Sequence, residues 1–337
     1  MSLVVDEEVV VIRDLTKQYG ELVALSRFSI TLRRGQILGL IGPNGAGKTT
    51  AIKILVGLAR PTAGTASIAG VDCVKHARKV RKLVGYMPDT FGSYDNMRVR
   101  EYLDFFGAAF GIKRKARNER INAVLETTNA MYMQDRFVET LSHGMKQRIG
   151  IARTLLHDPQ VLILDEPANG LDPQSRIDMR TLLLHLASLG KTLIVTSHIL
   201  PELSRICDQV AILTNGQLRA YGSLGEIMRE ISQERTIEVQ LAAEDQCDVA
   251  CERISSHEGA SGVEASAAES MVRFRTHLGE GAMGIILADL IQHDIRVTQF
   301  RELQVDLEDA YLSVTQQIET ATPEPVLEAD TSANATP

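Results

Sequence analysis

The feature that most constrains this chain is a glycine-rich run directly behind an apolar stretch at residues 36–41. Successive backbone N–H groups converge on phosphate oxygens only where no Cβ blocks the approach and where positive φ costs little. The amphipathic residues 51–56 predict a helix behind the run, and its positive end adds to the anion site. The pattern predicts a phosphate loop between a buried strand and a helix, and therefore a nucleoside triphosphate ligand. The run consists of Gly42, Pro43, Asn44, Gly45, Ala46, Gly47, Lys48, Thr49 and Thr50.

Two side chains of this run carry the predicted chemistry. Lys48 brings a positive charge to the outer phosphates, and the hydroxyl of Thr49 supplies a ligand for Mg²⁺. A chance glycine-rich turn is the alternative, but it explains neither the strand before the run nor the helix after it. We therefore predict that residues 42–50 hold a triphosphate and that Thr49 belongs to a metal site.

A second apolar strand, at residues 161–164, ends in the carboxylates of Asp165 and Glu166. A carboxylate in this position beside a phosphate loop can hold Mg²⁺, which compensates its charge. Because alternate strand residues face opposite sides, Glu166 points away from the metal and can polarise an attacking water. We predict Asp165 as a metal ligand and Glu166 as the general base. The alternative is a solvated strand end, which does not explain four aliphatic residues in succession.

Two further segments add candidate residues. Residues 192–195 predict a third strand, which ends in Thr196, Ser197 and His198. Alone, a histidine at a strand end is more often a surface residue. Residues 142–156 predict a helix with Ser142 as its N-cap, and Ser142 and Gly144 mark a candidate anion site at its start. The predicted inner face of this helix consists of Ile149, Ala152, Leu155 and Leu156.

In this order, the segments resemble the ATP-binding subunits of ABC transporters, over about residues 10–225. Residues 42–50 match the family's Walker A motif, 141–148 its signature, 161–166 its Walker B motif, 170–173 its D-loop and His198 its switch histidine. The resemblance implies an α/β fold of the ABC type, a P-loop NTPase core in which helices flank a mixed sheet. It also implies a helical subdomain at about residues 89–156, with ATP as the nucleotide and Mg²⁺ as its metal.

The resemblance also assigns roles that need a second copy. In this family two subunits pair head to tail, and each ATP lies between the phosphate loop of one subunit and the signature of the other. For this chain, that implies contacts of Ser142, His143 and Gly144 with the nucleotide of a partner. Asp172 would lie at the interface, and His198 would contact the γ-phosphate and hold the site closed. The expected assembly is a homodimer with two equivalent sites.

Tyr19 lies within residues 15–20, which match the place where the family presents an aromatic ring to adenine. Stacking on a π face tolerates any base, so selectivity for ATP over GTP follows from the resemblance alone. The alternative is a tyrosine at the rim of the site without contact to a base.

Several positions depart from the family pattern. Asp89 stands where a glutamine is expected, but its carboxylate can still reach Mg²⁺ or the water, so we include it among the metal ligands. His143 and Met145 stand where glycine and glutamine are common. A protonated His143 beside the γ-phosphate would favour the closed dimer, and dimerisation would then strengthen below about pH 6.5. The alternative is a tolerated variant whose ring turns away from the phosphate.

The segment between the phosphate loop and the signature resembles a small helical subdomain that receives a short cytoplasmic helix of the membrane partner. Its apolar residues repeat at helical spacing, and most of them are predicted to be core, with the remainder free to form a shallow groove. The partner implied is a transmembrane permease subunit of the ABC-2 type. The residues concerned are Phe91, Tyr94, Met97, Val99, Tyr102, Leu103, Phe106 and Phe110.

Composition bears on the surroundings of the chain. None of its apolar stretches reaches the length of a membrane span, and residues 1–8 are acidic where a signal peptide would be basic. We expect a cytoplasmic protein, peripheral at the cytoplasmic face of the membrane through its partner. With a net charge of −7 and no tryptophan, no nucleic-acid partner is expected. The cysteines form no disulfide pattern, and Cys247, Cys251 and His257 lack an evident fourth metal ligand.

Beyond residue 225 the pattern changes. Residues 236–241, 271–275 and 295–300 alternate like half-buried strands, and residues 282–292 predict a helix. We predict a small α+β accessory domain at residues 226–316, behind an ATP-binding domain at 1–225, and a disordered tail at 317–337. Residues 307–312 resemble the end of subunits that pair with ABC-2 exporters. The predicted inner face of the helix consists of Ile285, Ile286, Leu290 and Ile291.

The sequence therefore predicts an ATPase subunit that powers export of an unidentified substrate through a separate membrane protein. The alternative is a soluble ABC ATPase that acts on the ribosome or on DNA. That alternative fits less well, because DNA-repair members insert long coiled coils before the signature and translation members carry two ATPase units in one chain. A P-loop kinase or GTPase would leave residues 142–148 and His198 unexplained.

Overall fold

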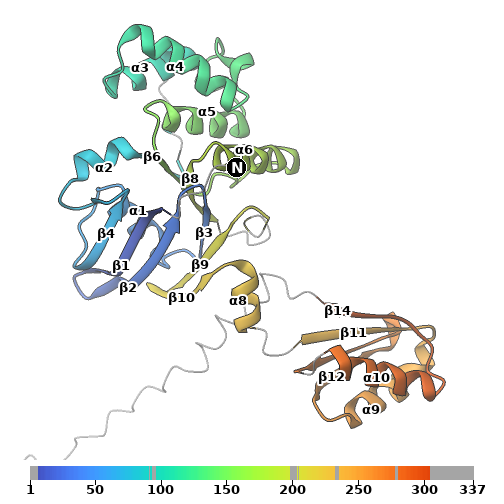
Figure 1. The fold of residues 1–337 in the computed structure, drawn as a ribbon. Coiled ribbons are helices and arrows are strands. Elements are labelled where there is room, and N and C mark those ends of the chain that lie inside the picture. Colours follow the sequence, from blue (N-terminus) through green and yellow to red (C-terminus); the bar gives the residue numbers. More distant parts are fainter. Residues whose placement is uncertain are drawn as a thin grey trace, which may run out of the picture.

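The computed structural model describes residues 7–90, 92, 96–197, 203, 205–231, 235–277 and 280–303. These residues form two units, each with its own sheet and hydrophobic core (Figure 1). The first unit has the predicted α/β architecture, a mixed sheet flanked by helices. His198, residues 307–312 and the predicted tail at 317–337 lie outside the described residues.

In the described part of the first unit, the strands form one sheet in the order β5–β4–β1–β2–β10–β9–β3–β8–β7–β6. The five strands from β9 to β6 pair in parallel. The strands from β5 to β2 pair in antiparallel fashion. The strands are β1 (Glu8–Tyr19), β2 (Leu22–Arg33), β3 (Ile37–Ile41), β4 (Ala63–Ile68), β5 (Val71–Asp72), β6 (Val84–Met87), β7 (Val161–Leu164), β8 (Thr192–Ser197), β9 (Gln209–Thr214) and β10 (Gln217–Gly222).

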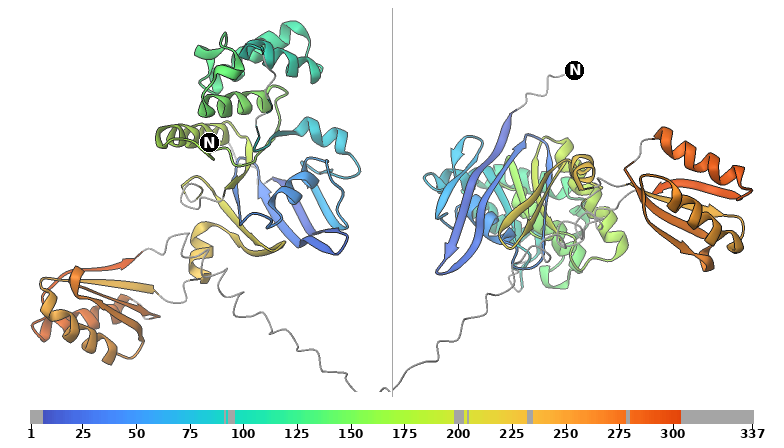
Figure 2. Two further views of the ribbon diagram at one scale, coloured as in Figure 1. Left: turned by 180° about the vertical axis from the view of Figure 1, so that it is seen from behind. Right: turned by 90° about the horizontal axis from the view of Figure 1, so that it is seen from below.

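The central strand β3 is buried on both faces, as its unbroken apolar sequence predicts. Ile37 and Ile41 join a core with α6 (Pro173–Ser188) and the helical subdomain, whereas Leu38 and Leu40 join a second core with α1 (Lys48–Leu55) and α2 (Ala77–Leu83). Figure 2 shows these layers from two further sides. The loop that leaves β3 therefore starts from a rigid position.

The helical subdomain stands at one end of the first unit, away from β1 and β2 (Figures 1 and 2). It consists of α3 (Val99–Ala109), α4 (Arg114–Thr127), η1 (Met131–Met133), η2 (Val138–Thr140) and α5 (His143–Leu155). Val99, Tyr102 and Leu103 are buried, as predicted, and Phe106 packs against the same core. Phe110 is 44% exposed, and its ring stacks on His157 with 4.2 Å between the centroids. Phe91 and Tyr94 lie outside the described residues.

The second unit follows α8 (Leu224–Ile231) and contains an antiparallel sheet in the order β12–β13–β11–β14. Side chains from α9 and α10 pack with Ile237, Val239 and Phe274 of this sheet in one core. The predicted strands and helix are present, and α9 and β12 are additions. The elements are β11 (Arg235–Leu241), η3 (Glu244–Gln246), α9 (Cys247–Ser256), β12 (Ala260–Ser266), η4 (Ala267–Glu269), β13 (Met271–Thr276), α10 (Glu280–Gln292) and β14 (Val297–Leu303).

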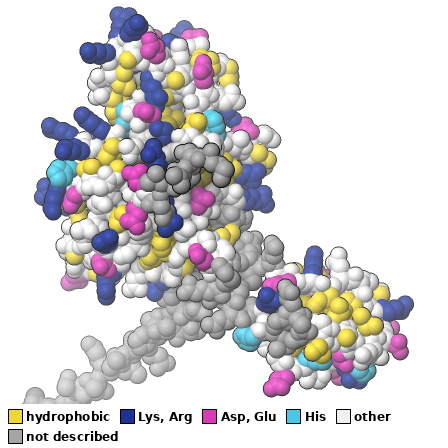
Figure 3. Space-filling view, in the orientation of Figure 1, with side chains coloured by type: hydrophobic (Ala, Val, Ile, Leu, Met, Phe, Trp, Pro, Cys, Tyr) yellow, Lys and Arg dark blue, Asp and Glu magenta, His cyan; other side chains and the backbone are white. Residues whose placement is uncertain are grey.

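The predicted inner face of α10 is half wrong. Ile286 and Leu290, four residues apart, are buried, but Ile285 and Ile291 are 63% and 59% exposed. The helix is apolar around most of its circumference, so hydrophobicity alone did not identify the inner face. Hydrophobic side chains accordingly gather on the surface of the second unit in Figure 3.

Among the described residues, no helix combines the length and the apolar character needed to cross a bilayer. Cys247 and His257, for which the sequence shows no complete set of metal ligands, lie in the second unit. Cys247 is buried, and the Nε2 atom of His257 lies 3.0 Å from a carboxylate oxygen of Asp289.

The face of the second sheet opposite the helices carries a buried carboxylate. Glu238, in the central strand β11, is only 2% exposed. Its two oxygens accept hydrogen bonds of 2.9 Å from the Nε atoms of Arg273 and Arg301, which lie on the neighbouring strands. The bond from Arg301 is the largest of the effects that lower the pKa of Glu238, and Arg273 adds to it. The ion pairs thus tie β13 and β14 to β11.

Replacing Glu238 by glutamine should lower the free energy of unfolding of the second unit by about 1–2 kcal/mol at pH 7, because two arginines lose a charged acceptor. Because the folded-state pKa of Glu238 is lowered, its contribution is present above the ordinary glutamate pKa and is lost as the pH falls through the folded value. The difference in unfolding free energy between the native chain and the variant should therefore become smaller below about pH 4.3. Hydrogen exchange of the β11 amides measures this free energy of unfolding, and the exposed Glu252→Gln serves as the control. An equal effect of both variants would contradict the assigned role.

Candidate active site

The phosphate loop connects β3 to α1, and its end shows why glycine is required. Gly47 is the N-cap of α1, with φ of 106°, in the left-handed region that side chains disfavour. A Cβ at this position would lie 2.6 Å from the carbonyl oxygen of Ala24. The loop thus leads into the start of α1, where the first N–H groups have no acceptor within the helix and can bind an anion.

Lys48 begins α1 and turns back along the loop. Its side chain is buried, and Nζ donates hydrogen bonds to the carbonyl oxygens of Gly42 at 2.5 Å and of Pro43 at 3.1 Å. Burial lowers the pKa of Lys48, while the negative charges of Glu166 and Asp165 act in the opposite direction. The ammonium group is therefore held close to the acidic pair by main-chain oxygens.

A cleft of about 390 Å³ lies in front of this loop. Gly42 and Pro43 do not line it and instead hold Lys48 through their carbonyl groups. Besides Leu22 and Ala24, all the lining residues were predicted from the sequence as site residues. They are Tyr19, Asn44, Gly45, Ala46, Gly47, Lys48, Thr49, Thr50, Asp89, Asp165 and Glu166.

The acidic pair lies at the end of β7, which runs parallel to β8. Thr196 of β8 links the two residues: its Oγ1 donates to a carboxylate oxygen of Asp165 at 2.6 Å and accepts from the backbone N of Glu166 at 2.9 Å. Glu166 has a left-handed backbone with φ of 49°, a conformation that few non-glycine residues adopt. The turn in the backbone, rather than strand alternation, aims its side chain into the cleft.

Thr196 is a site residue that the sequence did not single out. Its signal was a hydroxyl at a fully buried strand end, next to a strand that ends in carboxylates. Only the parallel pairing of β7 and β8 shows that the hydroxyl and the carboxylate meet.

Asp89 follows β6, which pairs in parallel with β7, and its exposed side chain lines the same cleft. Tyr86, in β6, is close enough to both carboxylates to be affected by their charges. Burial, followed by the charges of Asp165 and Asp89, raises the pKa of Tyr86 to about 12. The predicted metal ligands Thr49, Asp89 and Asp165 are therefore gathered in one place, and oxygen donors of this kind suit Mg²⁺.

Tyr19 lies at the outer end of the cleft, at the end of β1, and is 47% exposed. The Nζ atom of Lys17 lies 4.6 Å from the centre of its ring. A cation over one face of the ring leaves the other face as the surface on which a base could stack.

The remaining predicted residues lie apart from the cleft. Ser142 caps α5 by accepting a hydrogen bond from Met145 N, as predicted, and Asp172 caps α6 by accepting from Ser175 N at 2.9 Å. Hydrogen bonds from Ser175 are the main cause of the lowered pKa of Asp172. Ser142, His143, Gly144 and Asp172 are absent from the lining of the cleft. Within one chain, the described structure therefore brings together only part of the predicted site.

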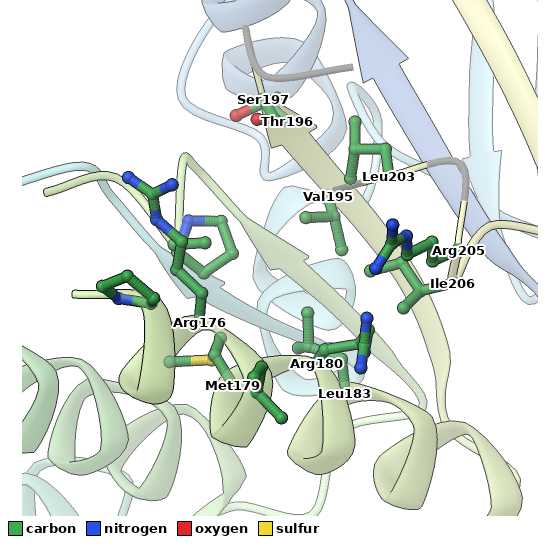
Figure 4. Close-up of a pocket in the computed structure, with 14 residues that line it drawn as sticks. Arg176, Met179, Arg180, Leu183, Val195, Thr196, Ser197, Leu203, Arg205 and Ile206 are labelled. Carbon is green, nitrogen blue, oxygen red and sulfur yellow. The ribbon is translucent and has the colours of Figure 1, made fainter. Parts of the chain in front are cut away.

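A second cavity, of about 370 Å³, lies between α6 and β8 (Figure 4). Met179, Leu183 and Val195 give it apolar walls, and Arg176 and Arg180 lie along its side on α6. Asp165 and Glu166 line the cleft in front of the phosphate loop and not this cavity. The phosphates are therefore assigned to that cleft.

Comparison with known proteins agrees with this geometry. A family model described as "ABC transporter" matches residues 25–169. The Nod factor export ATP-binding protein I of Ralstonia nicotianae is 38% identical over 217 residues, which cover 64% of this chain and 68% of that protein. The bacitracin transport ATP-binding protein BcrA of Bacillus licheniformis is 34% identical over 305 residues, 89% of this chain and 95% of that protein. This chain belongs to the ATP-binding subunits of ABC transporters.

Membership of this family makes the chain a nucleotide-binding protein and an ATPase. A solved structure titled "Structure of ATP binding subunit of ABC transporter" superimposes with a TM-score of 0.60 at 31% identity, over 66% of this chain and 92% of that chain. The fold class predicted from the sequence is thus confirmed. The similarity to BcrA extends over most of both chains, whereas the similarity to the Nod factor subunit covers about two thirds of this chain.

Replacing Lys48 by alanine should weaken ATP binding at least about tenfold, because a charged hydrogen-bond donor is worth roughly 1.5–3 kcal/mol. Calorimetric titration of the full chain with ATP measures the loss. Lys53→Ala removes an exposed lysine from the same helix and should leave the affinity unchanged. Equal affinity of the Lys48 variant and the native chain would refute the assigned role.

Proposed function

We propose that this chain powers export through a separate ABC-2 type membrane protein, as one half of a homodimer that closes on ATP. Support comes from relatives named for Nod factor export and bacitracin transport. The observation that carries the proposal is the position of Ser142, His143 and Gly144 outside the lining of the chain's own cleft. A helix start suited to anions, placed away from the phosphate loop of its own chain, needs a second chain to meet a phosphate.

Within the cleft, the loop and Lys48 bind the phosphates by main-chain N–H groups and a buried positive charge. Thr49 and Asp165 would hold Mg²⁺, with Asp89 as a further oxygen donor. The ion would neutralise negative charge on the phosphate oxygens. Thr196 fixes the orientation of Asp165, because its hydroxyl donates to one carboxylate oxygen and leaves the other to the cleft.

Glu166 is the residue proposed to activate water. Its left-handed backbone directs the side chain into the cleft, where it would accept a proton from the attacking water. The carbonyl oxygens of Gly42 and Pro43 hold the ammonium group of Lys48 near this carboxylate and limit its movement. His198 remains the proposed γ-phosphate contact from the sequence.

Dimer closure would follow from the two incomplete halves. The start of α5, capped by Ser142, would present its N–H groups to the triphosphate held by the partner's loop. Asp172 caps α6 close by and would lie at the same interface. ATP then favours the closed state, and hydrolysis removes that preference, so the cycle of the nucleotide becomes a cycle of opening and closing.

The helical subdomain is the proposed contact for the membrane partner. Phe105 and Phe110 on its surface are each 44% exposed. Phe110 stacks on His157, whose Nε2 lies 2.9 Å from the carbonyl oxygen of Val84 at the start of β6. Since β6 leads to Asp89, a displacement of α3 by a partner would reach the cleft through this contact. Attachment to the membrane would then depend on the permease.

Replacing Glu166 by glutamine should reduce the ATPase rate at least about a hundredfold, the usual contribution of a general base, while ATP still binds. The variant should accumulate closed dimers with Mg-ATP, which light scattering after size exclusion detects. The exposed Glu119→Gln on α4 is the control. Native turnover in the Glu166 variant would refute the base assignment. Monomers at saturating Mg-ATP would instead refute the dimer.

Purification from detergent-solubilised membranes separates export from the alternative. Export predicts that the full chain co-purifies with a protein that has several transmembrane segments. Ribosomes or DNA in the purified material would support the soluble alternative and overturn the proposed partner.

A further inference from the structure

His143 makes a contact that nucleotide binding does not require. It is the first residue of α5, and Asn169 lies three residues after Glu166. The Nε2 atom of His143 lies 2.9 Å from the carbonyl oxygen of Asn169. A carbonyl oxygen can only accept, so this bond is made by the tautomer that carries its proton on Nε2; the side-chain nitrogen of Gln147 lies 3.4 Å from the same atom. The bond joins the start of α5 to the segment between β7 and α6 of the same chain.

From Asn169 a series of hydrogen bonds leads to the acidic pair. Asn169 N donates to the carbonyl oxygen of Glu166 at 3.1 Å, and Glu166 N donates to Thr196 Oγ1 at 2.9 Å. Thr196 in turn donates to Asp165. Glu166 has a strained left-handed backbone, which persists only where its surroundings hold it. The bond from His143 is one of the contacts that fix this segment.

The helices α5 and α6 are also joined directly, at points that do not reach Glu166. Arg148 and Asp178 form an ion pair of 2.6 Å. Gly144 lies so close to Ser175 that a Cβ on it would be 3.1 Å from the hydroxyl oxygen. These contacts hold the two helices together, whereas His143 extends from α5 to the segment that carries the base.

We infer that His143 is a positioning residue, which couples the position of α5 to the position of the Glu166 backbone within one protomer. The inference rests on the proposed dimer, in which α5 meets the nucleotide of the partner. Nucleotide at the partner's site fixes the start of α5, and the His143–Asn169 bond then fixes the backbone of Glu166 at the protomer's own site. Binding at one site thereby prepares hydrolysis at the other. A glycine here would have no side chain to span this gap.

The test compares substitutions that keep or remove the donor. In His143→Gln the amide nitrogen reaches about as far from the backbone as Nε2 does, and in His143→Leu the size remains but the donor is lost. For the full chain, the leucine variant should lower kcat about fivefold and bring the Hill coefficient for ATP close to 1, with KM changed less than about twofold. The glutamine variant should retain most of both values.

Controls separate this coupling from a loss of structure. His185→Leu, at an exposed position of α6, should leave kcat and the Hill coefficient unchanged. If the leucine variant does not fold, His143→Asn serves in its place, because its shorter amide stops short of Asn169. Equal losses in the glutamine and leucine variants would show a merely structural role and overturn the inference.

The outcome for the native chain distinguishes the inference from the proposed function. If His143→Leu keeps the Hill coefficient of the native chain, the proposed coupling is wrong, but the proposed dimer is not affected. Absence of cooperativity in the native chain, together with a monomeric Glu166→Gln variant at saturating Mg-ATP, overturns the dimer and with it the inference.

Discussion

Parallel pairing of β3 with β8, and of β8 with β7, is the constraint on which the site depends. Parallel strands end at the same edge of a sheet, so the phosphate loop, Thr196 and the acidic pair meet although they lie far apart in sequence. Burial of β3 on both faces fixes the position of the loop. The carbonyl groups of the loop hold the ammonium group of Lys48 close to Asp165 and Glu166.

Around this edge, the chain uses hydrogen bonds to keep charged groups in unfavourable positions. Thr196 holds one oxygen of a nearly buried Asp165, and Glu166 keeps a left-handed backbone between the bonds of Thr196 and Asn169. Strain of this kind is maintained by its neighbours and is common where chemistry occurs. The same bonds make the acidic pair sensitive to the position of α5, because His143 reaches the backbone that follows it.

Local patterns predicted the parts of the fold that depend on nearby residues. The strand before Gly42, the Ser142 cap and the inner face of α5 follow from short sequence signals, and the structure has all of them. The outer position of Ile285 and Ile291 was missed, because α10 is apolar on both sides and its inner face is set by the sheet it packs on. The roles of Thr196 and the contact of His143 with Asn169 depend on pairing between distant segments, which spacing alone does not reveal.

The two units have separate hydrophobic cores, and among the described residues no buried apolar cluster includes members of both. Each core is complete within its own stretch of sequence, so recombination near residue 232 would leave both folding units intact. Evolution can therefore exchange, lengthen or lose the second unit while the ATPase keeps its active site. The second unit can then diversify while the catalytic unit stays almost unchanged.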